Sequence, residues 1–172
     1  MIKIALTGPE SSGKTTLSEL LAKHFAIDFV PEFARAYLEQ SNGTYEKDDL
    51  AKIAHGQLRA ILSAQQEHPT RKVLISDTDF VVIAVWSNYK YGSIDKEIDA
   101  LVHSTIFDLH ILCEPDIPWE KDDLRENPDD REELFALYEE ALNRYGKNYI
   151  VVNGSNEKRL KKVTKAIELI QK

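Results

Sequence analysis

The first stretch of the chain constrains its fold more than any other. Residues 2–7 are apolar enough for a buried parallel strand, and leucines recur at helical spacing over residues 17–24. Between them lies the complete pattern of a P-loop, Gly8-x-x-x-x-Gly13-Lys14-Thr15. The glycines let the backbone turn its N–H groups inward, so that the loop and the start of the helix surround a chain of phosphates. The stretch therefore predicts a nucleotide site.

The polar residues of the loop have separate expected roles. Lys14 is expected to bridge the β- and γ-phosphates of ATP, and the Thr15 hydroxyl to ligate Mg²⁺. We expect the nucleotide to contact Gly8, Glu10, Ser11, Ser12, Gly13, Lys14, Thr15 and Thr16, with Arg131 arriving from a later segment.

Charge and cysteine content exclude several classes of protein. A net charge of -7 over 172 residues argues against non-specific binding to nucleic acid or anionic lipid. The basic clusters, Arg71-Lys72 and Lys158-Arg159 with Lys161-Lys162, are interpreted as a strand edge or a solvated face. The only cysteine, Cys113, lies in an apolar strand, where buried packing is the expected role, and it fits a reducing compartment. With no signal-like segment and no apolar run near about 20 residues, we expect a cytoplasmic protein without a membrane span.

Strands alternate with helices along the chain, which predicts a parallel sheet covered on both faces. We therefore expect a single α/β domain over residues 1–172, a three-layer sandwich with a five-stranded sheet; the sequence does not determine an oligomeric state. The five strands are expected at 2–7, 26–30, 72–77, 109–113 and 149–152, and the later helices at 33–41, 46–67, 80–91, 93–103, from Asn127 to Gly146, and after Gly154 with Leu160, Val163, Ile167 and Ile170 inward.

Acidic residues follow two of the predicted strands. Asp77 ends the third strand and is the candidate metal-side acid, either as a magnesium partner or as a helix N-cap. The N-cap alternative applies more strongly to Asp79, whose other expected role is at the substrate or a hydroxyl. Glu32 follows the second strand and is a candidate general base, with an ion pair to Arg35 as the alternative. Arg35 is also a candidate substrate contact.

The polar loop 114–131 is predicted to act as a lid. Arg125 and Arg131 are candidates to reach the phosphates when the loop closes, or they neutralise neighbouring aspartates. Trp86 is a candidate stacking platform for a flat ring, although aromatic residues on a helix are more often core. The five histidines lack the spacing of a metal site, so we expect no zinc.

Four blocks in the same order resemble the ribosylnicotinamide kinase domain of NadR-type proteins. The blocks are Gly8 to Leu17, Pro31 to Arg35, Ser76 to Phe80 with Trp86, and Leu112 to Arg125. The resemblance implies a P-loop kinase-like fold that phosphorylates the 5′-hydroxyl of nicotinamide riboside with MgATP to give nicotinamide mononucleotide. It places Asp77 and Asp79 by the metal and ribose, Arg125 in the lid, and Glu32 where related nucleoside kinases have an acid near the reacting hydroxyl.

One departure from the family concerns the acceptor. Such domains often carry an aromatic residue immediately before the glutamate, where this chain has Pro31. If that aromatic stacks on nicotinamide, this chain uses another ring, for which Trp86 is the candidate, or a different substrate.

Two functional hypotheses follow. The first is a small-molecule kinase that uses ATP and Mg²⁺ on a nucleoside, with Lys14, Glu32, Asp77, Asp79 and Arg125 as catalytic residues. The second is a nucleotide-dependent switch whose loops change order on hydrolysis and which needs no small-molecule acceptor.

Overall fold

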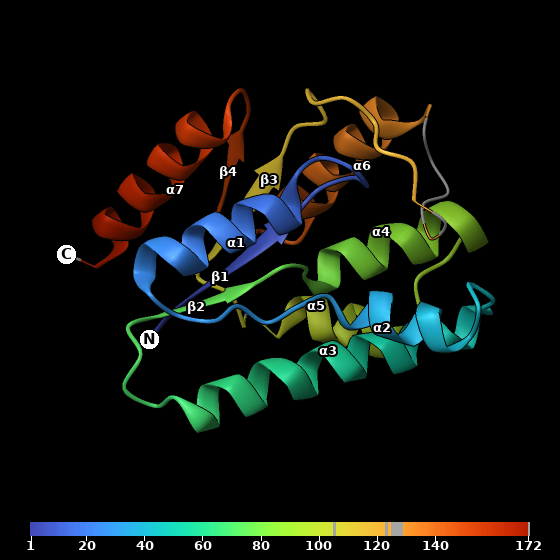
Figure 1. The fold of residues 1–172 in the computed structure, drawn as a ribbon. Coiled ribbons are helices and arrows are strands. Elements are labelled where there is room, and N and C mark those ends of the chain that lie inside the picture. The colour runs from blue at the N-terminus through green and yellow to red at the C-terminus, as the bar shows by residue number, and fades with distance from the viewer. Residues whose placement is uncertain (105, 123, 125–128, 172) are drawn as a thin grey trace.

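The computed structural model describes residues 1–172 except 105, 123, 125–128 and 172. Its sheet is parallel throughout, with the strand order β2-β1-β3-β4 (Figure 1). β1 therefore lies inside the sheet, and the loop that follows it emerges between two neighbouring strands. The strands are β1 (Ile2–Thr7), β2 (Val73–Ser76), β3 (Leu109–Cys113) and β4 (Tyr149–Val152).

Helices cover both faces of the sheet, as predicted. α1 and α7 lie on one face, and α3 to α6 lie on the other (Figure 1). The helices are α1 (Lys14–Phe25), α2 (Phe33–Gln40), α3 (Lys47–Glu67), α4 (Phe80–Tyr91), α5 (Lys96–His103), α6 (Arg131–Arg144) and α7 (Asn156–Ile170). α6 has Asp130 at its N-cap, later than the predicted start at Asn127, which lies outside the described residues.

The prediction of five strands is wrong, because the segment after α1 does not form a strand. Ala26 ends α1 in the left-handed region at φ 51°. In this segment only Val30 pairs with β2: its N–H donates to the Ile75 carbonyl at 2.8 Å, and its carbonyl accepts from the Asp77 N–H at 2.9 Å. Pro31 follows at once and has no N–H with which to extend the ladder. The segment therefore borders β2 without adding a strand.

Successive side chains of β1 point to opposite faces of the sheet and so belong to two separate apolar cores. Ile4 and Leu6 belong to the cluster shared with α1 and α7, whereas Ala5 belongs to the cluster shared with α3 to α6. Because both faces of the strand are buried, its sequence is apolar almost without interruption.

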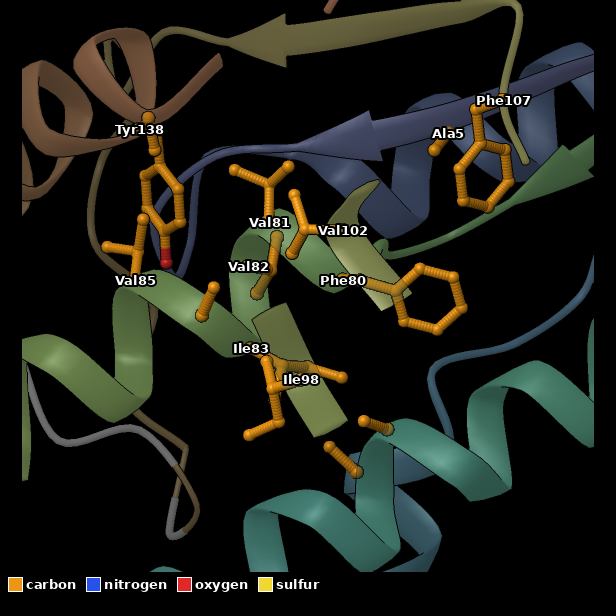
Figure 2. Close-up of a cluster of buried hydrophobic side chains, with 14 of the residues drawn as sticks. Ala5, Phe80, Val81, Val82, Ile83, Val85, Ile98, Val102, Phe107 and Tyr138 are labelled. Atoms are coloured by element: carbon orange, nitrogen blue, oxygen red, sulfur yellow. The ribbon is translucent and has the colours of Figure 1, made fainter. Parts of the chain in front are cut away.

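α4 is the central helix of the second core. It is buried from Phe80 to Val85, which suits a helix that is apolar on all sides. Figure 2 shows these side chains in one cluster with Ile98 and Val102 of α5. This packing fixes the start of α4, and with it the turn that leaves β2 at residues 77–79. Within the described residues, no helix combines the length and apolar character needed to span a membrane.

Candidate active site

The P-loop borders a pocket of about 220 Å³. The pocket brings together three separate segments: the predicted loop residues, the start of α2 with Glu32 and Arg35, and Trp86 of α4. Asp77 and Asp79 are buried and do not line it. The lining residues used below are Gly8, Glu10 to Thr16, Glu32, Arg35, Tyr45, Trp86, Tyr89, Ile117, Glu120 and Tyr138.

The P-loop lies close against the end of β3. Gly8 has φ 136°, and a Cβ at this position would lie 2.7 Å from the Cys113 carbonyl oxygen. Only glycine allows both the backbone angle and this approach. Inside the loop the Ser12 hydroxyl donates to the Pro9 carbonyl at 2.8 Å. The loop is therefore shaped by its own sequence and by its contact with the sheet.

Lys14 lies across the loop. Its Nζ donates to the Gly8 and Pro9 carbonyls, each at 2.8 Å. Both acceptors are neutral, and phosphate oxygens would give stronger charge-assisted bonds in their place. The geometry agrees with the expected role of Lys14 at a polyphosphate.

Asp77 lies directly behind the start of α1. Its two oxygens accept hydrogen bonds from the Thr15 hydroxyl at 2.8 Å and the Ser18 hydroxyl at 2.9 Å. Burial raises the pKa of Asp77, and the bonds from Thr15 and Ser18 oppose this shift. A carboxylate beside a hydroxyl is the oxygen-rich setting that Mg²⁺ prefers, with phosphates and waters as the other ligands. The residues present therefore fit the predicted magnesium site.

Glu32 projects into the pocket at the start of α2. It occupies the N-cap position but makes no side-chain cap hydrogen bond. Burial raises the pKa of its carboxyl, Lys14 lowers it, and the charges of Asp77 and Glu10 raise it. Glu32 thus lies within electrostatic reach of both the P-loop lysine and the metal-side acid.

Arg35 does not form the ion pair with Glu32 that was considered as an alternative. Its guanidinium pairs with Asp122 at 2.9 Å and with Glu39 at 3.3 Å. The Asp122 pair raises the pKa of Arg35 further. Arg35 therefore joins α2 to the 114–131 loop at the rim of the pocket.

Asp79 has the N-cap role. Its Oδ1 accepts from the Val82 N–H at 2.7 Å, and its Oδ2 lies 2.6 Å from His110 Nδ1 and accepts from the Thr7 hydroxyl. Its side chain is fully buried, with both oxygens occupied. The structure therefore does not bring Asp79 into the pocket, and its contacts match the alternative stated for it.

Four aromatic side chains line the same pocket as the P-loop and are called the aromatic wall below: Tyr45, Trp86, Tyr89 and Tyr138. Trp86 Nε1 donates to the Tyr45 hydroxyl at 2.9 Å. The two rings pack edge to face, with 4.9 Å between their centroids. Tyr89 and Tyr138 complete the wall. Burial raises the pKa of Tyr138, and the charges of Glu10, Asp79 and Glu32 add to the shift. Of these rings the sequence singled out Trp86 as a candidate; Tyr45 was missed because no motif surrounds it.

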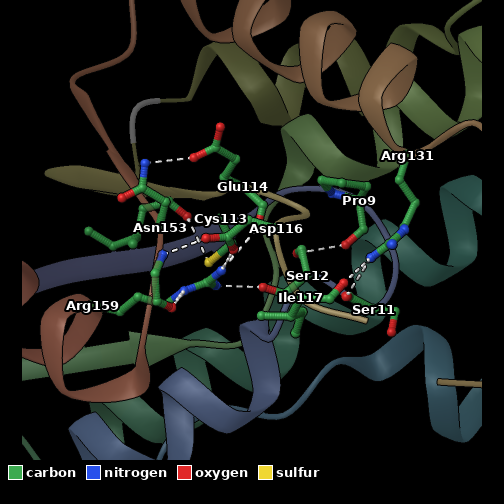
Figure 3. Close-up of polar contacts among 12 residues, drawn as sticks. Pro9, Ser11, Ser12, Cys113, Glu114, Asp116, Ile117, Arg131, Asn153 and Arg159 are labelled. Carbon is green, nitrogen blue, oxygen red and sulfur yellow. Dashed lines mark hydrogen bonds and ion pairs between the residues drawn. The ribbon is translucent and has the colours of Figure 1, made fainter. Parts of the chain in front are cut away.

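The 114–131 loop contacts the P-loop. Arg131 Nη1 donates to the Ile117 carbonyl at 2.9 Å and the Ser11 carbonyl at 3.2 Å, and the Glu120 N–H donates to Ser11 Oγ at 3.0 Å. Figure 3 shows the Arg131 side chain reaching toward Ser11 and Ile117. Arg131 thus lies beside the P-loop, and its contact with a nucleotide stays a prediction. Arg125 lies outside the described residues and stays a prediction.

Arg159 is the exception in its basic cluster, because Lys158, Lys161 and Lys162 are exposed as expected of a solvated face whereas Arg159 is buried. It is 2% exposed, and its guanidinium reaches the Ser12 carbonyl at 2.6 Å, the Glu114 carbonyl at 3.0 Å, and the Asp116 carboxylate (Figure 3). It therefore ties the P-loop to the end of β3. The usable sequence signal was its position four residues before Val163, on the buried face of α7.

The comparisons with known proteins agree with this geometry. A family model described as an AAA domain matches residues 3–159. A curated relative, the trifunctional NAD biosynthesis/regulator protein NadR of Escherichia coli (strain K12), is 34% identical over 145 residues. The match covers 81% of this chain and 35% of that protein, so the chain spans about a third of its relative's length.

Two solved structures share the fold. A NadR protein in complex with NR superposes with a TM-score of 0.77 at 22% identity, covering 98% of this chain and 48% of that one. A deoxyadenosine kinase from M. mycoides with bound dATP superposes with a TM-score of 0.64 at 18% identity, covering 97% of this chain and 100% of that one. These likenesses confirm the P-loop kinase-like fold. The family match over nearly the whole chain shows that the protein belongs to the AAA-domain family of P-loop proteins, and 81% of the chain is similar to NadR.

Proposed function

We propose that this protein is a nucleoside kinase that transfers the γ-phosphoryl group of ATP to the 5′-hydroxyl of nicotinamide riboside. The observation that carries the proposal is that one pocket holds a complete P-loop, the carboxyl of Glu32 and a wall of aromatic rings. The nearby relative described as a NAD biosynthesis protein, and the similar fold solved with NR, support the choice of acceptor.

The residues divide the reaction between two ends of the pocket. At the nucleotide end, the P-loop amides and Lys14 bind the phosphates, and Thr15 and Asp77 are the residues that would hold magnesium. The metal supplies neutralisation of the charge on the phosphate oxygens. Arg131, at the P-loop, and Arg125 would bring further positive charge to the same end.

At the acceptor end, Glu32 takes the proton of the attacking hydroxyl. The new bond joins the 5′-oxygen to the γ-phosphorus, the bond from that phosphorus to the β-phosphate oxygen breaks, and ADP leaves. The raised pKa of Glu32 brings it closer to neutrality, where a general base works best. Trp86 lines the pocket, and the cationic pyridinium ring of nicotinamide riboside is attracted to aromatic faces. The Tyr45 ring beside it already carries the Lys90 ammonium over its face, 4.0 Å from the ring centroid.

A nucleotide-dependent switch needs neither the aromatic wall nor an acid at the acceptor end. Both features lie in the pocket with the P-loop, so the geometry favours the kinase.

Two variants test the separate roles of the nucleotide end and the acceptor end of the pocket. Lys14→Ala should abolish turnover and weaken binding of a non-hydrolysable ATP analogue, since it removes the phosphate contact. Glu32→Gln should keep analogue binding and lose turnover by about 10²–10⁴-fold, the usual contribution of general base catalysis.

The measurements are phosphorylation of a panel of ribosides and a thermal-shift titration with the analogue. Absence of phosphorylation across the panel, with the nucleotide still bound, would refute the kinase proposal. Equal loss of nucleotide affinity in both variants would refute the division of roles.

A further inference from the structure

A buried glutamine on α3 holds the chain on both sides of Glu32. Gln57 is fully buried. Its Oε1 accepts from the Phe33 N–H at 2.7 Å, and its Nε2 donates to the Pro31 carbonyl at 3.2 Å. Pro31 and Phe33 are the two sequence neighbours of Glu32. A carboxamide supplies an acceptor and a donor in one rigid plane, so a single side chain fixes the backbone before and after Glu32.

The same amide also reaches the segment that carries Asp77. Gln57 Nε2 donates to Ser76 Oγ at 3.2 Å, and Ser76 Oγ donates to the Thr78 carbonyl at 2.7 Å. Ser76 and Thr78 are the two sequence neighbours of Asp77. Gln57 therefore lies where the segment of the candidate base meets the segment of the candidate metal ligand.

The residue before Gln57 provides a second, independent contact. A Cβ at Gly56 would lie 2.2 Å from Cε1 of the Phe33 ring. The absence of a side chain thus lets α3 approach the residue next to Glu32. Gly56 and Gln57, which are adjacent on α3, therefore both hold residues 31–33. Gln57 does so through its hydrogen-bonded amide and Gly56 through close packing.

We infer that Gln57 is a positioning residue that sets Glu32 relative to Asp77 for phosphoryl transfer. The inference rests on the proposed function and deepens it. Gln57 does not line the pocket, so it acts through the two segments and touches neither reactant. Proton transfer needs the carboxylate within hydrogen-bond reach of the hydroxyl while the phosphate is held at the metal side, and a displacement of about 1 Å can cost about 100-fold in rate.

The test compares Gln57→Met with the unaltered protein. Methionine keeps the length of the side chain and removes both hydrogen-bonding functions. We expect kcat for riboside phosphorylation to fall about 10- to 100-fold, while the affinity for a non-hydrolysable ATP analogue changes less than about twofold. Two controls lie on the same helix. Gln66→Met makes the same chemical change at an exposed position, and Ile61→Val loosens the buried face of α3 four residues beyond Gln57.

The double variant Gln57→Met/Glu32→Gln shows whether the effect passes through Glu32. If Gln57 acts by positioning the base, its replacement should cost nothing further once the base is absent. Full additivity of the two losses would assign Gln57 a merely structural role and overturn the inference.

A second readout needs no acceptor. NMR titration of the Glu32 carboxyl carbon reports its pKa directly. In Gln57→Met the Glu32 carboxyl should become more accessible to water, so its pKa should be lower than in the unaltered protein. The control variants should leave this pKa unchanged. Should Gln57→Met not fold, Ser76→Ala removes one partner of the amide and should shift kcat and the titration in the same direction by a smaller amount.

The outcomes distinguish the two proposals. If the unaltered protein phosphorylates no riboside, the proposed function fails, and the carboxyl titration alone tests whether Gln57 sets the surroundings of Glu32. If Glu32→Gln stays active, the kinase proposal stands, but Glu32 is not the base and the positioning role is refuted. If Glu32→Gln is inactive while Gln57→Met keeps full kcat and an unmoved titration, only the positioning role is refuted.

Discussion

Removing the guanidinium of Arg159 should destabilise this domain far more than its place in a basic cluster suggests. In Arg159→Met the carbonyls of Ser12, Gly154 and Glu114 lose their donor, and the Asp116 carboxylate loses its ion pair. Removing one partner of a buried pair costs about 3–5 kcal/mol. Because the Asp116 side chain is 30% exposed, water compensates part of this loss, and we expect about 3 kcal/mol.

Thermal and urea unfolding measure this loss. For a domain of this size, about 3 kcal/mol corresponds to a Tm lower by about 6–12 °C. The matched control is Lys158→Met, the exposed neighbour in the same basic cluster, which should stay within about 0.5 kcal/mol. If Arg159→Met loses less than about 1 kcal/mol, or no more than the control, Arg159 does not anchor the P-loop to β3.

Three further changes test other contacts. Gly56→Ala should cost about 1–3 kcal/mol in urea unfolding, because its Cβ would overlap Phe33; a gain in stability, as is usual for this change in an unstrained helix, would contradict the close packing. Glu32→Gln should raise Tm at pH 7, and the gain should vanish as the pH falls toward 4.5, because an acid whose pKa is raised in the folded state penalises folding only while it is ionised; an equal gain at all pH values would contradict this. Cys113, whose pKa burial raises to about 11, should not react with a disulfide reagent at pH 8 until the protein is unfolded in urea, and rapid reaction of the native protein would refute its burial.

The strand–loop–helix at the start of the chain could be predicted because its signals are local. The glycine spacing, the lysine and the apolar strand before them lie within a few residues of one another, and the structure has β1, the P-loop and α1 where they were expected. Most of the other helices could be predicted for the same reason, since apolar periodicity depends on the helix itself. The exceptions are α4, which is apolar on all sides, and α6, which begins later than predicted. Asp77 could be proposed as a metal-side acid because the end of a parallel strand beside a P-loop faces the phosphates.

Other features depended on pairing between distant segments. The stretch 26–30 has the composition of a strand, but a strand needs a continuous partner, and only Val30 finds one. Asp79 could serve a substrate or cap a helix by sequence alone, and its contacts with Thr7 and His110 from two other strands decided for the cap.

By itself the sequence predicted the P-loop, the α/β class and the acidic residues that follow the strands, since these depend on local patterns. Only the tertiary structure decided which of these groups share a pocket, that Arg159 is an interior anchor, and that Gln57 joins the segments of Glu32 and Asp77. The physical reason is that a polar side chain is stable in the interior only with hydrogen-bond partners, and the partners of Gln57 and Arg159 lie 24, 26 and 147 positions away along the chain.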